Sequence, residues 1–278
     1  MNETPDRAGR FTVSGPESTR ANRAWWDGEA DEYMAEHGAF LGDAELVWGP
    51  EGWTEAELRI LGPEGCLDGR DVLEFGSGAA QAGRWCAGQG ARVVATDLSL
   101  GMLRQGAHID DTRRAATVPN HTGPALAQCD ASRLPFADNA FDVVFSAFGA
   151  VPFIADTAAL MRELARVTKP GGLVAFSTTH PLRWTLPDVP DESGLLVTYS
   201  YFDTTPYAEA RGERVLYAEH HRTLEARVAE LLGAGLVLEQ LRELPWKESN
   251  NQTWGGWSPL RGNLVPGTLV LTGRKPRT

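Results

Sequence analysis

Three short stretches of the sequence carry residue types that could bind one ligand. Residues 76–78 (Gly-Ser-Gly) follow an apolar run that begins at Asp71, while Asp97 and Asp130 each end a later apolar run. Glycines expose the backbone to a ligand, and a carboxylate such as Asp97 can accept hydrogen bonds from the two hydroxyls of a ribose. Two other interpretations stay open: an ordinary strand-to-helix turn at 76–78, and an Asp97 that caps a helix starting at Ser99.

The elements around these stretches alternate between strand and helix. Apolar runs predict strands, and helical spacing predicts helices between them. The predicted strands are 71–75, 91–97, 125–129, 141–146 and 173–178, with final strands at 236–244 and 268–273, and the predicted helices are 81–89, 100–108, 158–168 and 223–232. This alternation predicts a doubly wound, mostly parallel α/β sheet, in which Asp97 reaches the same edge as the glycine turn.

The segments outside the alternation are predicted to surround that edge. Residues 1–20 lack hydrophobic periodicity and are expected to be loosely attached. Residues 21–66 are expected to form a helical lid, because the helix-like stretch 22–40 carries more aromatic surface than a solvated helix needs; it either docks on the core or closes over a ligand. Insertions are predicted at 180–222, with strand-like pieces at 195–202 and 213–219, and at 246–266.

Composition limits the classes of protein and partner. The 278 residues have a formal net charge of −11 and no apolar run of membrane-spanning length, so nucleic acid and membrane insertion are not expected. Residues 1–16 are polar, unlike a signal peptide. The three cysteines stand in unrelated contexts with no metal-ligand spacing, which favours a cytoplasmic protein without a metal. The oligomeric state is left open.

Three side chains are candidates for acid–base chemistry. His180 follows the fifth predicted strand at the ligand-binding edge and can titrate near neutrality, although the plainer interpretation of His180-Pro181 is that it forms a loop. His220 lies between Glu219 and His221; in an extended segment the two histidines face opposite ways, so at most one reaches the site. Tyr33 is the third candidate, as a hydrogen-bond donor or as a packed ring.

Taken in order, the motifs over about 71–244 resemble those of class I S-adenosylmethionine-dependent methyltransferases of the small-molecule group. The resemblance rests on 74–78 (Glu-Phe-Gly-Ser-Gly), Asp97, 129–131 (Cys-Asp-Ala) before Leu-Pro-Phe, 141–146 and 169–172 (Lys-Pro-Gly-Gly), the last of which is expected to form the turn before the fifth strand. It implies a Rossmann-like seven-stranded sheet within a methyltransferase domain at 67–278, a tyrosine near the cofactor from the lid, and S-adenosyl-L-methionine as cofactor. The implied cofactor-binding residues are Glu74, Gly76, Ser77, Gly78, Asp97, Leu98, Met102, Asp130, Ala131 and Ser146. Ala80 stands where a third glycine often occurs.

The alternatives differ in ligand and in activity. A dinucleotide-binding oxidoreductase would want a glycine where Gln81 stands, and Glu74 would repel its phosphates while suiting a sulfonium cation and an amino-acid tail. A cofactor-binding module without transfer activity, acting through a partner, stays open. The acceptor is expected to be a small apolar or ring-containing molecule methylated on oxygen, nitrogen or carbon, although a sugar would suit the same aromatic residues. Those residues are Trp25, Trp26, Trp184, Tyr199, Tyr201, Trp246, Trp254 and Trp257.

Overall fold

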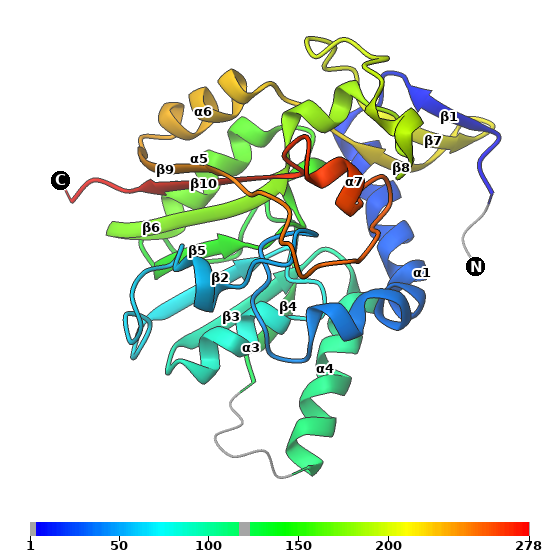
Figure 1. The fold of residues 1–278 in the computed structure, drawn as a ribbon. Coiled ribbons are helices and arrows are strands. Elements are labelled where there is room, and N and C mark those ends of the chain that lie inside the picture. The colour runs from blue at the N-terminus through cyan, green and yellow to red at the C-terminus, as the bar shows by residue number, and fades with distance from the viewer. Residues whose placement is uncertain (1–3, 117–122, 278) are drawn as a thin grey trace.

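A seven-stranded sheet forms the centre of the molecule, with helices on both faces (Figure 1). This computed structural model describes residues 4–116 and 123–277. The order is β4-β3-β2-β5-β6-β10-β9, and β10 runs antiparallel to both of its neighbours. The strands are β2 (Asp71–Phe75), β3 (Arg92–Asp97), β4 (Ala125–Gln128), β5 (Phe141–Ser146), β6 (Thr168–Thr179), β9 (Val237–Glu243) and β10 (Thr268–Arg274). The predicted doubly wound, mostly parallel sheet is confirmed.

The helices lie in two layers. In Figure 1, α3 and α4 cover one face of the sheet, and α5 and α6 cover the other. They are α3 (Gln81–Gly88), α4 (Leu100–Ala115), α5 (Thr157–Val167) and α6 (Leu224–Gly233), with α1 (Gly15–Leu41), α2 (Glu55–Leu58) and α7 (Pro259–Gly262) outside the two layers. The predicted helix at 100–108 continues to Ala115, and part of the predicted loop that follows lies outside the described residues. No helix in the described part of the chain combines the length and apolarity that spanning a bilayer requires.

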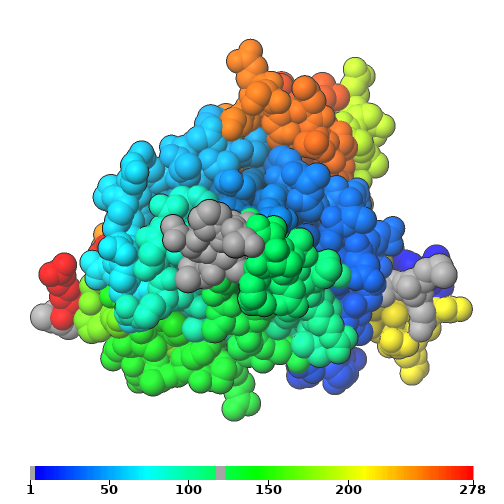
Figure 2. Space-filling model, turned by 90° about the horizontal axis from the view of Figure 1, so that it is seen from below, coloured from blue at the N-terminus to red at the C-terminus, as the bar shows by residue number. Residues whose placement is uncertain are grey.

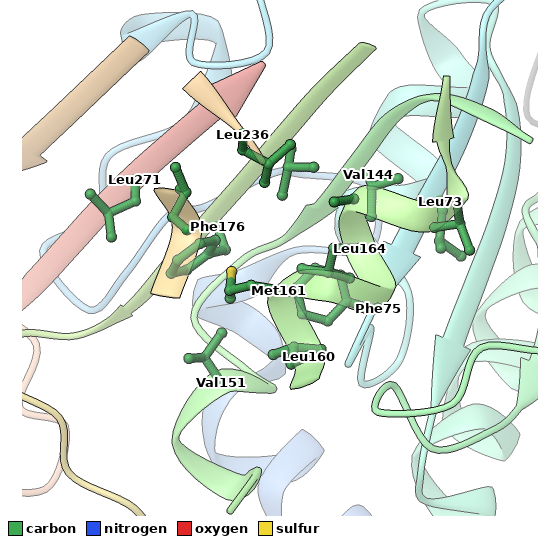
Figure 3. Close-up of a cluster of buried hydrophobic side chains, with 14 of the residues drawn as sticks. Leu73, Phe75, Val144, Val151, Leu160, Met161, Leu164, Phe176, Leu236 and Leu271 are labelled. Atoms are coloured by element: carbon green, nitrogen blue, oxygen red, sulfur yellow. The ribbon is translucent and has the colours of Figure 1, made fainter. Parts of the chain in front are cut away.

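The core beneath β5 and β6 shows why α5 forms where the spacing predicts it. Leu160, Met161 and Leu164 share one face of α5 and are at most 1% exposed, and they point toward the sheet residues Phe75 and Phe176 (Figure 3). Full burial of each such side chain contributes about 1.5–3 kcal/mol. The N-cap of the helix is Asp156, whose carboxylate accepts from Ala159 N at 2.8 Å. The cap and the buried apolar face therefore both favour a helix over this segment.

A second sheet of three antiparallel strands stands beside α1 at the end of the central sheet (Figure 1). Its strands are β1 (Arg7–Arg10), β7 (Tyr207–Arg211) and β8 (Arg214–Glu219). The strand predicted at 213–219 is confirmed as β8. The β1 strand corrects the expectation of a loosely attached 1–20, whose first three residues lie outside the described ones. Main-chain pairing of β1 with β7 needs no hydrophobic pattern, so the sequence carried no signal for it.

Two further expectations are wrong. Residues 195–202 form no strand; a 3₁₀ turn, η3 (Glu192–Leu195), is followed by irregular chain in which Val197 and Phe202 are 75% and 81% exposed, so these apolar side chains have no sheet to pack on. Residues 169–172 are part of β6 instead of a turn before it. The backbone is nevertheless irregular at this point. The register between β5 and β6 shifts here, and Gly171 has a left-handed φ of 80°.

Candidate functional site

The turn after β2 brings backbone to the edge of the sheet. Gly76 and Gly78 both have left-handed φ values, 59° and 54°, which glycine adopts without strain. A Cβ atom on Gly76 would lie 2.4 Å from the Cβ of Ala150, so the turn and the loop after β5 approach each other more closely than any side chain permits. Ala80, which stands where the family often has a third glycine, is the N-cap of α3 and has a left-handed φ of 60°.

One large cavity opens at this edge. The empty space at this edge amounts to about 1250 Å³, a volume that includes the open solvent at its mouth. Ten of the predicted site residues line it: Tyr33, Glu74, Gly76, Ser77, Gly78, Asp97, Leu98, Met102, Asp130 and Ala131. The other three, Ser146, His180 and His220, do not.

Asp97 anchors the cavity between two main-chain donors. Its Oδ2 accepts from Gly78 N and its Oδ1 from Ser99 N, both at 2.8 Å. Each oxygen keeps further lone-pair capacity, so holding the backbone does not exclude holding two hydroxyls of a ligand. Burial raises the pKa of Asp97 to about 6, against the backbone hydrogen bonds that lower it. The helix cap itself is Ser99, whose Oγ accepts from Met102 N at 3.0 Å.

Glu74 is a second buried acid in the wall of the cavity. It is 3% exposed, and its Oε2 accepts from Gly83 N at 2.7 Å. Burial raises its pKa to about 8, so in the ligand-free protein the group is mainly neutral at pH 7. A nearby positive charge would offset the desolvation and favour the negative charge that the sequence analysis expected to suit a sulfonium cation.

Two serines near the turn carry buried hydroxyls without a hydrogen-bond partner in the described chain. Ser77 lines the cavity between the two turn glycines, and its Oγ has no partner there. Buried polar groups are normally paired, so Ser77 fits a ligand that supplies the missing partner. Ser146 also has an unpartnered, buried Oγ but lies outside the lining. Asp130 lines the cavity, and its Oδ1 accepts from Ser132 N at 2.8 Å.

The helix α1 docks on the core, as one of the two interpretations of the aromatic segment predicted, and part of it lines the cavity. Asp27 Oδ1 accepts from Ser99 Oγ at 2.8 Å and from Gly101 N at 2.9 Å. On the same helix, Trp26 and Tyr33 line the cavity with ring centroids 5.4 Å apart. Figure 2 shows the blue surface of α1 between the green surface of α4 and the orange surface of the chain near residue 250.

Only part of the predicted aromatic wall is found. Trp26 and Trp254 line the cavity, and Trp254 stacks on His37 of α1 at 3.9 Å and 4°. The remaining six do not line it: Trp25, Trp184, Tyr199, Tyr201, Trp246 and Trp257. Phe148 and Phe153 belong to the wall and were missed as site residues, although their position in an apolar loop directly after the fourth strand was a usable signal. Asn22 was missed too.

The predicted histidines have structural partners. His180 Nε2 lies 2.9 Å from Glu243 Oε1, and its Nδ1 accepts from Leu182 N at 3.1 Å. His220 Nε2 lies 2.9 Å from Ser18 Oγ beneath α1, and burial lowers its pKa to about 4. Tyr33 alone of the three lines the cavity, and burial with the nearby Asp97 raises its pKa.

The sheet order, the glycine turn and the acidic strand ends around one cavity are those that the resemblance to class I S-adenosylmethionine-dependent methyltransferases implies. Residues 73–176 match the family model described as a methyltransferase domain.

Similar proteins extend the comparison. A demethylmenaquinone methyltransferase of Mycolicibacterium paratuberculosis is 43% identical over 136 residues, which are 45% of this chain and 49% of that protein. One of Corynebacterium kroppenstedtii is 39% identical over 129 residues, again 45% and 49%. The chain thus matches about half the length of these curated relatives. The crystal structure of an S-adenosylmethionine-dependent methyltransferase from Mesorhizobium loti has 26% identity and a TM-score of 0.59, covering 82% of this chain and 100% of that one.

Proposed function

We propose that this protein transfers the methyl group of S-adenosylmethionine to an oxygen, nitrogen or carbon atom of an uncharged, ring-containing small molecule. The observation that carries the proposal is the joint lining of one cavity by the turn glycines, Asp97 and Asp130. When bound, the cofactor supplies an already activated methyl group. The protein's own contribution is to align the two reactants at about 3–3.5 Å and to exclude water.

Different residues of this chain would bind different parts of the cofactor. Asp97 would accept hydrogen bonds from the ribose hydroxyls while it also accepts from Gly78 N. Asp130 would accept a hydrogen bond from the adenine amino group. The unpartnered Oγ of Ser77 and the acid of Glu74 are placed for the amino-acid end of the cofactor. The roof formed by α1 excludes water from the reacting atoms.

The charge of the cavity supports an uncharged acceptor. Among the described residues that line it, Glu45, Asp97 and Asp130 are acids, Glu74 is a further acid that is mainly neutral without a ligand, and none is a lysine, arginine or histidine. An anionic acceptor would meet repulsion without a counter-charge. Since the relatives are named for demethylmenaquinone, we propose a quinone-type ring as the acceptor. We also propose that the enzyme acts in the cytoplasm, where the three cysteines, free thiols in the structure, remain reduced.

The second candidate is a cofactor-binding protein without methyl-transfer activity. One specific observation favours keeping it: the structure of the [4+2]-cyclase SpnF has the same fold, with a TM-score of 0.61 at 18% identity, so the fold alone does not specify methyl transfer.

Calorimetry and mass spectrometry test the proposal together. We expect S-adenosylmethionine to bind and NADH not to bind, and we expect a mass gain of one methyl group on demethylmenaquinone reduced to its quinol. Absence of S-adenosylmethionine binding would refute the cofactor assignment. Binding without methylation of any quinol or other ring acceptor would favour the second candidate.

A further inference from the structure

The cavity extends along the edge of the sheet beyond the proposed cofactor contacts. Those contacts lie at the ends of β2, β3 and β4, whereas Gly49 and Pro50 line the cavity beside the start of β10. A Cβ atom on Gly49 would lie 2.2 Å from Oγ1 of Thr268, the first residue of β10, which pairs with the last residue of β6. Four strand spacings separate β3 from β10, roughly 19 Å at about 4.8 Å each. The wall at Gly49 is therefore a separate end of the same cavity.

Three apolar side chains from three segments line this end: Phe40 of α1, Pro50 of the loop that follows it, and Trp254 of the insertion at 246–266. The ring centroids of Phe40 and Trp254 are 5.7 Å apart. Asn250 joins the insertion to the loop, because its Nδ2 donates to Pro50 O at 2.7 Å. A Cβ atom on Gly52 would contact both the Phe40 ring at 3.7 Å and Asn250 Nδ2 at 3.3 Å. We call Phe40, Pro50 and Trp254 the ring platform.

The position of Trp254 is fixed through its ring and its main chain. The indole stacks on the imidazole of His37, which itself does not line the cavity. The main chain of Trp254 pairs with that of Trp257 across a two-residue turn, with N–O distances of 2.8 and 2.9 Å. In that turn Gly256 N donates to Asp188 Oδ1 at 2.8 Å. A side chain that is already ordered loses little conformational freedom when a ligand packs on it.

The chemistry of this end suits an uncharged ring. The rest of its wall includes Leu41 and Val47, and among the described residues that line this end only Glu45, which is exposed, is ionisable. An indole offers a planar ring both a large apolar area and a favourable stacking geometry. The ring platform lies outside residues 73–176, the part that matches the methyltransferase model. Cofactor contacts and platform thus belong to different parts of the chain.

We propose that the ring platform binds the ring of the methyl acceptor and that Trp254 determines the specificity for it. This inference rests on the proposed function. The acceptor ring packs on the indole at the β10 end, while the cofactor binds at the end formed by β2, β3 and β4. Trp254 contributes binding and orientation and takes no part in proton transfer.

The first test measures binding to the full chain by calorimetry, in the presence of S-adenosylhomocysteine. The probe is a dimethylnaphthoquinone, a quinone ring whose two methyl groups block addition of the protein's free thiols. We expect Trp254→Leu to weaken binding of this probe roughly tenfold, because the stacking surface is lost. Trp254→Phe keeps an aromatic ring and should weaken it by about threefold or less. The affinity for S-adenosylmethionine should be unchanged in both variants.

The second test measures methylation of the quinol of demethylmenaquinone. A platform that contacts the acceptor equally in the ground state and the transition state affects KM and not kcat. Trp254→Leu should therefore raise KM for the quinol roughly tenfold and leave kcat within about twofold of the wild type.

Trp53→Leu is the matched control for both tests. Trp53 is also a half-buried tryptophan, and its Nε1 donates to Pro245 O at 2.7 Å, directly before the same insertion. It does not line the cavity. Its replacement should change neither the affinity for the dimethylnaphthoquinone nor KM for the quinol.

The outcomes separate this inference from the proposed function. A wild type that does not bind S-adenosylmethionine, or binds it and methylates no ring acceptor, overturns the proposed function and this inference with it. An active wild type that does not bind the dimethylnaphthoquinone, or whose Trp254→Leu variant changes no more than Trp53→Leu, overturns the inference alone. So does a Trp254→Leu variant that loses kcat at an unchanged KM. Thermal unfolding of each variant shows whether it is folded, and equal losses in Trp254→Phe and Trp254→Leu would contradict a role for the ring.

Discussion

Replacing Asp97 with asparagine tests the cofactor site most directly. In the structure its two carboxylate oxygens accept from Gly78 N and Ser99 N at 2.8 Å. Asparagine has one acceptor oxygen, so one main-chain donor loses its partner and a ribose hydroxyl meets a neutral acceptor. Hydrogen bonds to a charged acceptor contribute about 1.5–3 kcal/mol. We therefore expect calorimetry to show S-adenosylmethionine binding weakened roughly 10- to 150-fold.

The pH dependence of binding gives the same prediction a second readout. Burial raises the pKa of Asp97 to about 6 in the free protein, whereas hydroxyl donors favour the ionised carboxylate. Binding should therefore strengthen as pH rises through about 6 in the wild type, by up to roughly tenfold per pH unit below that value. Asp97→Asn has no such group to ionise and should lose this dependence.

The matched control is Asp156→Asn. Asp156 accepts from Ala159 N at 2.8 Å in the same main-chain role but does not line the cavity. Because asparagine caps a helix about as well as aspartate, this variant should keep nearly the wild-type stability and show no change in cofactor affinity. Equal affinities of Asp97→Asn and wild type, or an equal loss in Asp156→Asn, would refute the reasoning.

Three further outcomes follow from buried side chains. Burial raises the folded-state pKa of Glu74 to about 8, so the wild type should lose stability as pH rises from its usual pKa toward 8, by at most about 1.4 kcal/mol per unit; urea unfolding of Glu74→Gln should lack this loss. His180→Ala breaks the contact with Glu243, so its melting temperature should fall while its pH–rate profile stays that of the wild type. Leu164→Ala removes a fully buried side chain and should destabilise the protein by about 2–5 kcal/mol in the same urea assay.

The sheet and the position of the glycine turn and the two aspartates at one cavity were predictable because local signals set them. Strand-to-helix alternation determines which strand ends share an edge, and Asp97 and Asp130 both stand at such ends. The turn at 76–78 is specified by two glycines, which adopt its left-handed backbone angles without strain. For these features the sequence pattern and the geometry have the same short range, so the prediction and the structure agree.

The acceptor side was less predictable because long-range packing determines it. Trp254 stacks on His37, which is more than two hundred residues away in the sequence. The β1 strand pairs with β7, which is similarly distant in the sequence, through main-chain hydrogen bonds. Aromatic residues also pack in cores: Trp184 and Trp246 are 5% and 6% exposed and do not line the cavity. Residue type alone cannot separate a ligand wall from a core, so an aromatic-rich insertion predicts packing before it predicts binding.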